Sequence, residues 1–136
     1  MSLLSGSQKA TVVVIDDNPF VCRALKTELE ILGFNVSVFH GAESFLASQF
    51  PIDDTCLLSD IYMPGMNGIE LCRHLASAGR SLGIVLMSGR DDEQTRRLAR
   101  QAKPAAILFK PFDEVALLRA IRKALGHRSK SKSSRQ

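Results

Sequence analysis

Short apolar runs rich in β-branched residues alternate with amphipathic stretches from residue 11 to residue 125, and this alternation constrains the fold more than any other feature. Each apolar run has the length of one buried strand, and the runs lie at 11–16, 34–39, 55–60, 82–88 and 105–109. The stretches between them repeat apolar residues at helical spacing, which predicts helices at 19–32, 42–49, 68–77 and 92–102 and a last one from 114. Strands that alternate with helices in this way form a parallel sheet covered on both faces.

Single residues predict where the helices begin and end. Asn18 and Pro19 provide an N-cap and a first-turn proline for the first helix, and Gly33 stops it. Asp113 caps the last helix, whose core-facing residues are expected to be Val115, Leu118, Ile121 and Leu125. The fold class is therefore α/β, and five strands favour a doubly wound, flavodoxin-like sheet with the order 2-1-3-4-5 and helices on both faces.

Charge and length divide the 136 residues into one domain and two terminal segments. Residues 127–136 contain four basic residues and no acidic one, so the 14 basic residues that remain of 18 balance the 14 acidic residues of the domain. We expect a flexible N-terminus at 1–10, a folded domain at 11–126 and a disordered basic tail or linker at 127–136. Nucleic-acid binding is expected only through that tail, or if the chain lacks an output domain.

Membrane and secreted classes are disfavoured. No apolar run approaches the roughly 18 residues of a membrane span, and residues 1–9 lack the pattern of a signal peptide. The three cysteines, Cys22, Cys56 and Cys72, have no metal-ligand spacing and lie in apolar surroundings. Reduced core thiols and a cytoplasmic location are the resulting expectations.

Polar side chains gather at the predicted carboxyl edge of the sheet. Asp16 and Asp17 follow the first strand and Asp60 ends the third, while Ser88 ends the fourth and Lys110 follows the fifth. Ligands of doubly wound sheets bind at this edge, in the crevice where the winding reverses between the neighbouring first and third strands. Taken singly, each residue could be an ordinary turn former or surface residue, but together they suggest a site.

The chemistry of this set points to a metal and a phosphoryl group. Close carboxylates repel one another unless a cation compensates, and Mg²⁺ prefers such oxygen ligands and is often shared with a phosphate. The ammonium and hydroxyl groups suit phosphoryl oxygens, and an aspartate can carry a phosphoryl group covalently. The residues alone leave open whether the site belongs to a phosphorylated switch or to a phosphatase.

Four motifs resemble the receiver domain of bacterial two-component response regulators over residues 11–125. They are the pair Asp16-Asp17, the segment DIYMPGMNG at 60–68, Ser88-Gly89 and Lys110-Pro111-Phe112. The segment at 60–68 is the most specific of the four. Receivers usually carry an aromatic residue three positions before the lysine, where this chain has Ile107, so the aromatic part of the usual switch is in doubt.

The resemblance implies a role for each residue of the edge. Asp60 is the expected phosphoacceptor, and Mg²⁺, which Mn²⁺ can replace, is the expected cofactor. Its expected ligands are Asp17, Asp16 directly or through water, Asp60 and the backbone carbonyl of Tyr62. Ser88 and Lys110 are expected to contact phosphoryl oxygens, and the Lys110–Pro111 peptide is expected to be cis.

The implied function is a signalling switch and not an enzyme with a separate substrate. Its phosphodonor is expected to be a histidine kinase or a histidine phosphotransfer protein. The expected output surface is formed by the helix at 92–102, the strand at 105–109 and the last helix, and its basic residues suit a homodimer or an acidic partner. The alternatives are an adaptor that never uses phosphate, a small phosphatase of the haloacid dehalogenase type, and a fragment of a DNA-binding regulator.

Overall fold

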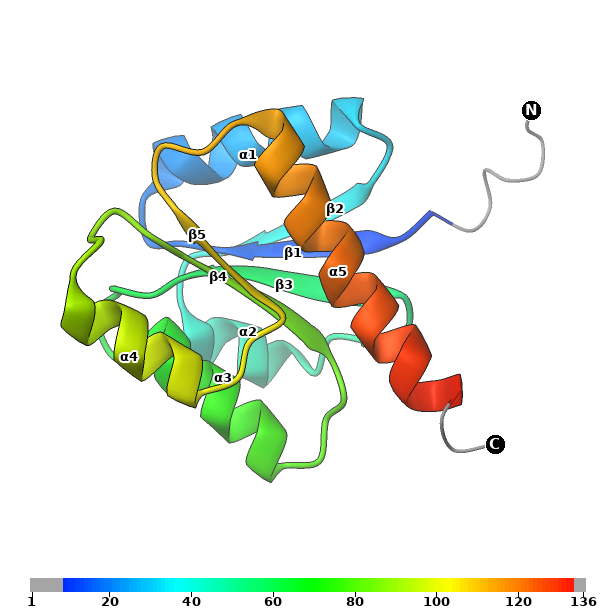
Figure 1. Cartoon of the computed structure of the whole chain (residues 1–136). Coiled ribbons are helices and arrows are strands. Elements are labelled where there is room, and N and C mark those ends of the chain that lie inside the picture. The colour runs from blue at the N-terminus through cyan, green and yellow to red at the C-terminus, as the bar shows by residue number, and fades with distance from the viewer. Residues whose placement is uncertain (1–8, 134–136) are drawn as a thin grey trace.

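A computed structural model describes residues 9–133 of the chain (Figure 1). Five parallel strands form one sheet in the order β2-β1-β3-β4-β5, which confirms the predicted fold and strand order. The strands are β1 (Thr11–Ile15), β2 (Asn35–Phe39), β3 (Thr55–Asp60), β4 (Gly83–Ser88) and β5 (Ala106–Phe109). Because β1 pairs with both β2 and β3, the winding reverses beside β1, and the carboxyl ends of β1 and β3 lie next to each other.

Helices connect the strands and begin at the predicted residues or one residue later. They are α1 (Pro19–Ile31), α2 (Ala42–Ser48), α3 (Gly68–Ser77), α4 (Glu93–Gln101) and α5 (Glu114–Ser133). The side chains of Asn18, Asp92 and Asp113 accept hydrogen bonds from backbone amides in the first turns of α1, α4 and α5. These contacts satisfy donors that a helix leaves unpaired at its N-terminus.

The sheet separates two apolar cores (Figure 1). On one face, Val12 and Val14 of β1 pack with Leu29 of α1 and with the buried residues of α5. On the other, Val13 and Ile15 of the same strand pack with α2, α3 and α4. All residues of β3 and β4 are buried because helices cover both sides of these strands.

The buried face of α5 differs from the prediction. Ile121 is buried, but Val115 is 62 % exposed, and Leu118 and Leu125 are only half-buried. The buried residues are instead Leu117, Ala120, Ile121 and Ala124. The prediction gave weight to large apolar residues, whereas small residues let α5 approach β4 so closely that a Cβ at Gly83 would lie 2.2 Å from the carbonyl oxygen of Ala124.

The C-terminal boundary also differs from the expected one. Helix α5 continues through Ser133, whereas we expected a disordered segment from residue 127. Ser, Lys and Arg are all compatible with a helix, and neither Gly126 nor any proline stops this one. The remainder of the tail, 134–136, and residues 1–8 of the expected flexible N-terminus lie outside the described residues. No helix in the part that the structure describes is long and apolar enough to span a membrane.

Gly83→Ala is predicted to destabilise the domain by about 1–3 kcal/mol, because the new methyl group would overlap with backbone atoms of α5. Gly126→Ala is the matched control: a Cβ there meets no heavy atom within 4 Å, and alanine favours a helix by up to about 1 kcal/mol over glycine. Urea unfolding of both variants measures the difference. Equal stability of the wild type and Gly83→Ala would contradict the close packing of α5 on β4.

Candidate functional site

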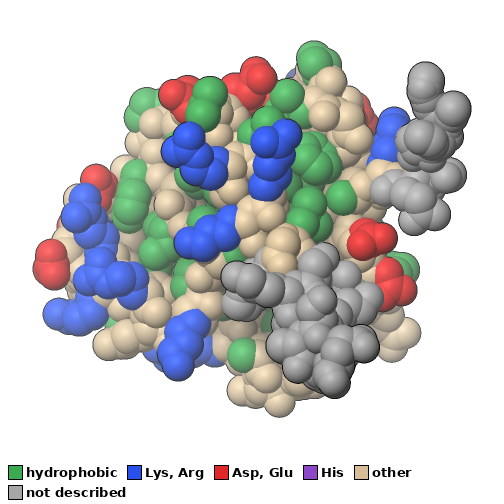
Figure 2. Space-filling model, turned by 45° about the vertical axis from the view of Figure 1, so that its right-hand side comes forward, with side chains coloured by type: hydrophobic (Ala, Val, Ile, Leu, Met, Phe, Trp, Pro, Cys, Tyr) green, Lys and Arg blue, Asp and Glu red, His purple; other side chains and the backbone are tan. Residues whose placement is uncertain are grey.

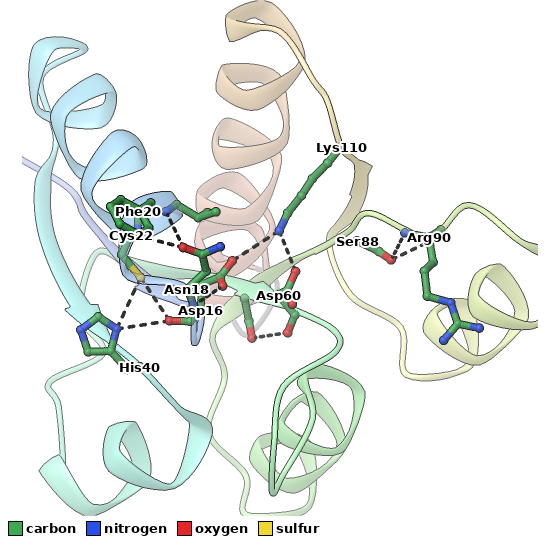
Figure 3. Close-up of polar contacts among 11 residues, drawn as sticks. Asp16, Asn18, Phe20, Cys22, His40, Asp60, Ser88, Arg90 and Lys110 are labelled. Carbon is green, nitrogen blue, oxygen red and sulfur yellow. Dashed lines mark hydrogen bonds and ion pairs between the residues drawn. The ribbon is translucent and has the colours of Figure 1, made fainter.

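The four predicted strand ends meet at the carboxyl edge of the sheet. Asp16 directly follows β1, Asp60 and Ser88 end β3 and β4, and Lys110 directly follows β5. In Figure 3 the ammonium group of Lys110 reaches down between Asp16 and Asp60. Residues far apart in the sequence therefore form one site, as the strand order predicts.

Lys110 bridges two buried carboxylates. Its Nζ atom donates a hydrogen bond of 2.9 Å to Oδ1 of Asp60 and lies 3.4 Å from Oδ2 of Asp16. Asp60 is 8 % exposed and Asp16 2 % exposed, so solvent screens these charges little. The backbone amide of Asn18 donates a further hydrogen bond of 2.9 Å to Asp16.

The pKa values of the bridged pair reflect burial and charge. Burial raises the pKa of Asp60 above its ordinary value, Lys110 opposes that shift, and the charges of Asp16 and Asp17 add to it. Burial acts to lower the pKa of Lys110, but the hydrogen bond and charge of Asp60, together with Asp16, raise it overall. Lys110 therefore stays protonated at neutral pH and partly compensates the crowded carboxylates.

Three carboxylates of this edge could hold a cation. One oxygen each of Asp16, Asp17 and Asp60 lie within 4.8 Å of one another. An octahedral Mg²⁺ with ligands at about 2.1 Å places opposite oxygens about 4.2 Å apart, so small side-chain rotations suffice. Asp17 is exposed, which leaves one side of the cluster open to water ligands. The donor set thus fits a hard divalent cation.

The loop after Asp60 has residues that serve its geometry. A Cβ at Gly68 would lie 2.4 Å from the carbonyl oxygen of Asp60, so only glycine fits there. Gly65 has a φ of +74°, and Asn67 forms a reciprocal capping box with Glu70 at the start of α3. Much of the specificity of this segment in the sequence is therefore structural, and Asp60 is its one carboxylate.

Glu43 of α2 supports the same loop and was not identified from the sequence. Its Oε2 atom accepts a hydrogen bond of 2.8 Å from the backbone amide of Met66, and that bond lowers the pKa of Glu43. The contact joins residues 23 positions apart, with no motif to link them. An acidic residue in the first turn of a helix looks like an ordinary dipole partner, so no sequence pattern singles out Glu43.

Ser88 lies at the predicted position but contacts its own loop. Its hydroxyl accepts a hydrogen bond of 2.9 Å from the amide of Arg90 and donates one of 3.0 Å to the carbonyl of the same residue. Figure 3 shows Ser88 and Arg90 on the far side of Lys110 from Asp16. The structure places Ser88 at the edge, with its hydroxyl already engaged.

Tyr62 also lies at the edge, but its side chain points toward α4. The phenol shares a hydrogen bond with the hydroxyl of Thr95, and the guanidinium of Arg90 lies 4.5 Å from the centre of the ring. Thr95 is fully buried in the first turn of α4. The sequence analysis did not identify Thr95, because a threonine inside a helix has no distinctive signal.

His40 lies beside the site, against the backbone of Asp16. Its Nδ1 atom is 3.3 Å from the carbonyl oxygen of Asp16, to which the thiol of Cys22 also donates at 3.2 Å. Burial, followed by the charge of Asp16, raises the pKa of Cys22, so this thiol is not activated as a nucleophile. Both side chains contact the backbone behind Asp16 and leave its carboxylate free to face Lys110 (Figure 3).

A family model described as the response regulator receiver domain matches residues 12–122. The chain belongs to the response regulator receiver family. The cis Lys110–Pro111 peptide agrees with the expectation from this family. At the position where receivers usually carry an aromatic residue, Ile107 is half-buried on β5 and packs against the core formed with α2, α3 and α4.

Similar proteins include regulators of transcription. The transcriptional regulatory protein FixJ of Azorhizobium caulinodans is 36 % identical over 115 residues, which cover 85 % of this chain and 54 % of FixJ. The response regulator protein TmoT of Ectopseudomonas mendocina is 34 % identical over 120 residues, which cover 88 % of this chain and 54 % of TmoT. This receiver chain thus spans about half the length of these two relatives.

Solved structures agree with the assignment. The response regulator StyR superposes with a TM-score of 0.84 at 36 % identity, covering 94 % of this chain and 65 % of that one. The structure named FixJ-N superposes with a TM-score of 0.81 at 30 % identity, covering 88 % of this receiver and 96 % of that chain.

Asp60→Asn is predicted to stabilise the receiver at neutral pH, because it removes a buried charge while Lys110 keeps its contact with Asp16. Burial raises the pKa of Asp60 in the folded state, so the folded protein still binds a proton at pH values where the unfolded chain has released it. The wild type therefore loses stability as the pH rises through the pKa of folded Asp60. The gain in the variant is therefore full above this pKa and disappears as the pH falls toward 3.8, the ordinary value.

Urea unfolding at neutral pH and at about pH 4 measures this gain. Asp17→Asn is the control, and its gain is expected to be smaller because Asp17 is exposed. A gain for Asp60→Asn that grows on acidification would contradict the burial argument.

Proposed function

We propose that this receiver is a phosphorylation-controlled switch that accepts a phosphoryl group on Asp60 from a histidine kinase or a histidine phosphotransfer protein. The proposal rests mainly on one observation. Lys110 bridges the nearly buried carboxylate of Asp60 to that of Asp16, and Asp17 lies close enough for all three carboxylates to share one metal ion. In this proposal an oxygen of Asp60 attacks phosphorus, the phosphorus–nitrogen bond to the donor imidazole breaks, and the imidazole retains the electron pair and takes up a proton.

The residues around Asp60 then have distinct roles. Lys110 moves part of its interaction from Asp60 to a phosphoryl oxygen, and the hydroxyl of Ser88 donates to another after leaving Arg90. Asp16, Asp17, Asp60 and the backbone carbonyl of Tyr62 would hold Mg²⁺, which Mn²⁺ can replace. When bound, the cation neutralises charge on the carboxylates and on the transferred group. The close approach of the three carboxylates supports this ligand set.

The receiver is proposed to be a phosphoacceptor and not an enzyme that turns over a separate substrate. A protein donor has to bring its histidine to Asp60 and therefore contacts the rim around it. Helix α1 begins at this rim, where Phe20 is 74 % exposed, and both Phe20 and Ile31 at the far end of the helix line a groove along α1. The exposed ring of Phe20 at the rim supports docking of such a donor.

The output surface is proposed to consist of α4, β5 and α5. Arg97, Arg100, Arg119, Arg122 and Lys123 are exposed there, and none of them has an acidic partner within the described residues. Figure 2 shows Lys and Arg side chains over much of this side, while Asp and Glu lie mainly toward its margins. A basic surface of this kind supports an acidic partner, or a second copy that offers its own acidic residues.

A cytoplasmic location completes the proposal, since the three free, buried cysteines suit a reducing compartment. Nucleic-acid binding by this receiver is proposed only through its basic C-terminal residues.

Incubation with Mg²⁺ and acetyl phosphate is predicted to add one phosphoryl group to the wild type, and Asp60→Asn should abolish the addition because the acceptor oxygen is lost. Asp17→Ala should remove the metal dependence and most of the rate. Intact-mass spectrometry measures both. Asp91→Asn, which alters an exposed aspartate paired with Arg96, is the control and should behave as the wild type. Undiminished, acid-stable phosphorylation of Asp60→Asn would refute the assignment.

Removal of the Tyr62 ring or the Arg90 side chain is predicted to shorten the phosphoryl lifetime. The guanidinium of Arg90 lies over the ring of Tyr62, which follows Asp60 by two residues, and in this proposal the pair restricts the path of the attacking water. Tyr62→Ala and Arg90→Ala should therefore lose phosphate up to about tenfold faster, or about 1.4 kcal/mol in the barrier. The rate is measured after removal of acetyl phosphate, and slower or unchanged loss would contradict the steric argument.

A further inference from the structure

The side chain of Tyr62 links two parts of the molecule that the sequence keeps 33 residues apart. Tyr62 lies in the loop between β3 and α3 and is 40 % exposed as a residue, yet its phenol reaches the hydroxyl of Thr95, a fully buried residue. Thr95 belongs to the first turn of α4. The loop that follows Asp60 is therefore attached to the helix at the start of the output surface.

Arg90 and Asp92 complete this connection on the side of α4. The guanidinium of Arg90 covers the ring of Tyr62 and lies 3.3 Å from a carboxylate oxygen of Asp92. Asp92 caps α4 by accepting a hydrogen bond of 2.8 Å from the amide of Thr95. Tyr62 thus meets the helix through Thr95 and through Arg90, and both routes converge on the first turn of α4.

The same group of contacts includes Ser88. The two hydrogen bonds of its hydroxyl hold the backbone of Arg90. If the hydroxyl turns to a phosphoryl oxygen, the carbonyl of Arg90 loses the hydrogen bond that Ser88 donates to it, and the hold on the residue that covers Tyr62 is weakened. Events on either side of Asp60 therefore act on one cluster of side chains, Tyr62, Arg90, Asp92 and Thr95.

We propose that Tyr62 is a positioning residue that couples occupancy of the carboxylate site to α4 through the hydroxyl of Thr95. The inference rests on the proposed function, in which the backbone carbonyl of Tyr62 is a metal ligand. A shift of that carbonyl toward the cation moves the ring, and the ring is fixed to α4. Ile107 provides no ring for this purpose, whereas Tyr62 provides one that already contacts the helix.

The coupling is measured on the full chain by the amide NMR shifts that saturating Mg²⁺ and beryllium fluoride produce at Asp60 and at Ala99, one turn beyond Thr95. Thr95→Val removes the buried hydroxyl and keeps the branched shape, and Tyr62→Phe removes the phenol oxygen and keeps the ring under Arg90. Thr27→Val, an exposed threonine of α1, is the matched control. Tyr62 is the one tyrosine of a chain without tryptophan, so its fluorescence reports directly on the site.

In the wild type and Thr27→Val, both amides should shift, and the tyrosine emission should change with the same Mg²⁺ midpoint. In Thr95→Val and Tyr62→Phe, the shift at Asp60 should persist, while the shift at Ala99 falls at least about twofold. A merely structural hydrogen bond would lower stability without reducing the transmitted shift. Full-sized shifts at Ala99 in both variants would overturn the inference and leave the proposed function intact. No response at Asp60 in the wild type would overturn both.

Discussion

The bridge from Lys110 to the buried carboxylates of Asp60 and Asp16 is the interaction on which the site at the carboxyl edge of the sheet depends. Three carboxylates lie close enough to share a cation, and two of them are almost without solvent. Such a cluster is unfavourable unless a positive charge is fixed beside it, because burial and mutual repulsion both oppose ionisation. The strand order fixes that charge: β5 brings its lysine to the same edge as β1 and β3.

The sequence was sufficient to predict the sheet, its strand order and the residues of the edge, because strand ends in a parallel sheet follow from the period of the pattern alone. It was insufficient where a contact depends on one side chain meeting another across the fold. Glu43 and Thr95 support the loops beside Asp60, but a glutamate and a threonine in first turns of helices are too common to stand out. The packed face of α5 was predicted imperfectly for a related reason, since Ala120 and Ala124 decide how closely it approaches the sheet.

The segment DIYMPGMNG shows why a motif can be more specific than its chemistry requires. Asp60 is the proposed phosphoacceptor, whereas Gly65 supplies a positive φ, Asn67 caps α3, and Gly68 leaves room for the carbonyl of Asp60. Gly65, Asn67 and Gly68 can each be replaced only by a residue of similar conformational freedom or size. The pattern is therefore diagnostic because geometry and chemistry constrain neighbouring positions at once.

Charge is divided unevenly between the two halves of the chain. Residues 1–78 hold four basic and nine acidic residues, and residues 79–136 hold 14 basic and five acidic ones. The proposed phosphoryl group carries about two negative charges and replaces the single charge of the Asp60 carboxylate, so it would add about one negative charge to the acidic half, where Asp16 and Asp17 also lie. Within the site, the positive side chain that contacts Asp16 and Asp60 is Lys110, which belongs to the basic half and immediately follows β5. A change of charge at Asp60 therefore acts on the strand at the centre of the proposed output surface through Lys110, and on α4 through Tyr62. Both routes start at the end of β3 and reach β5 and α4, two elements of one surface, which gives a compact site a direct physical connection to a partner.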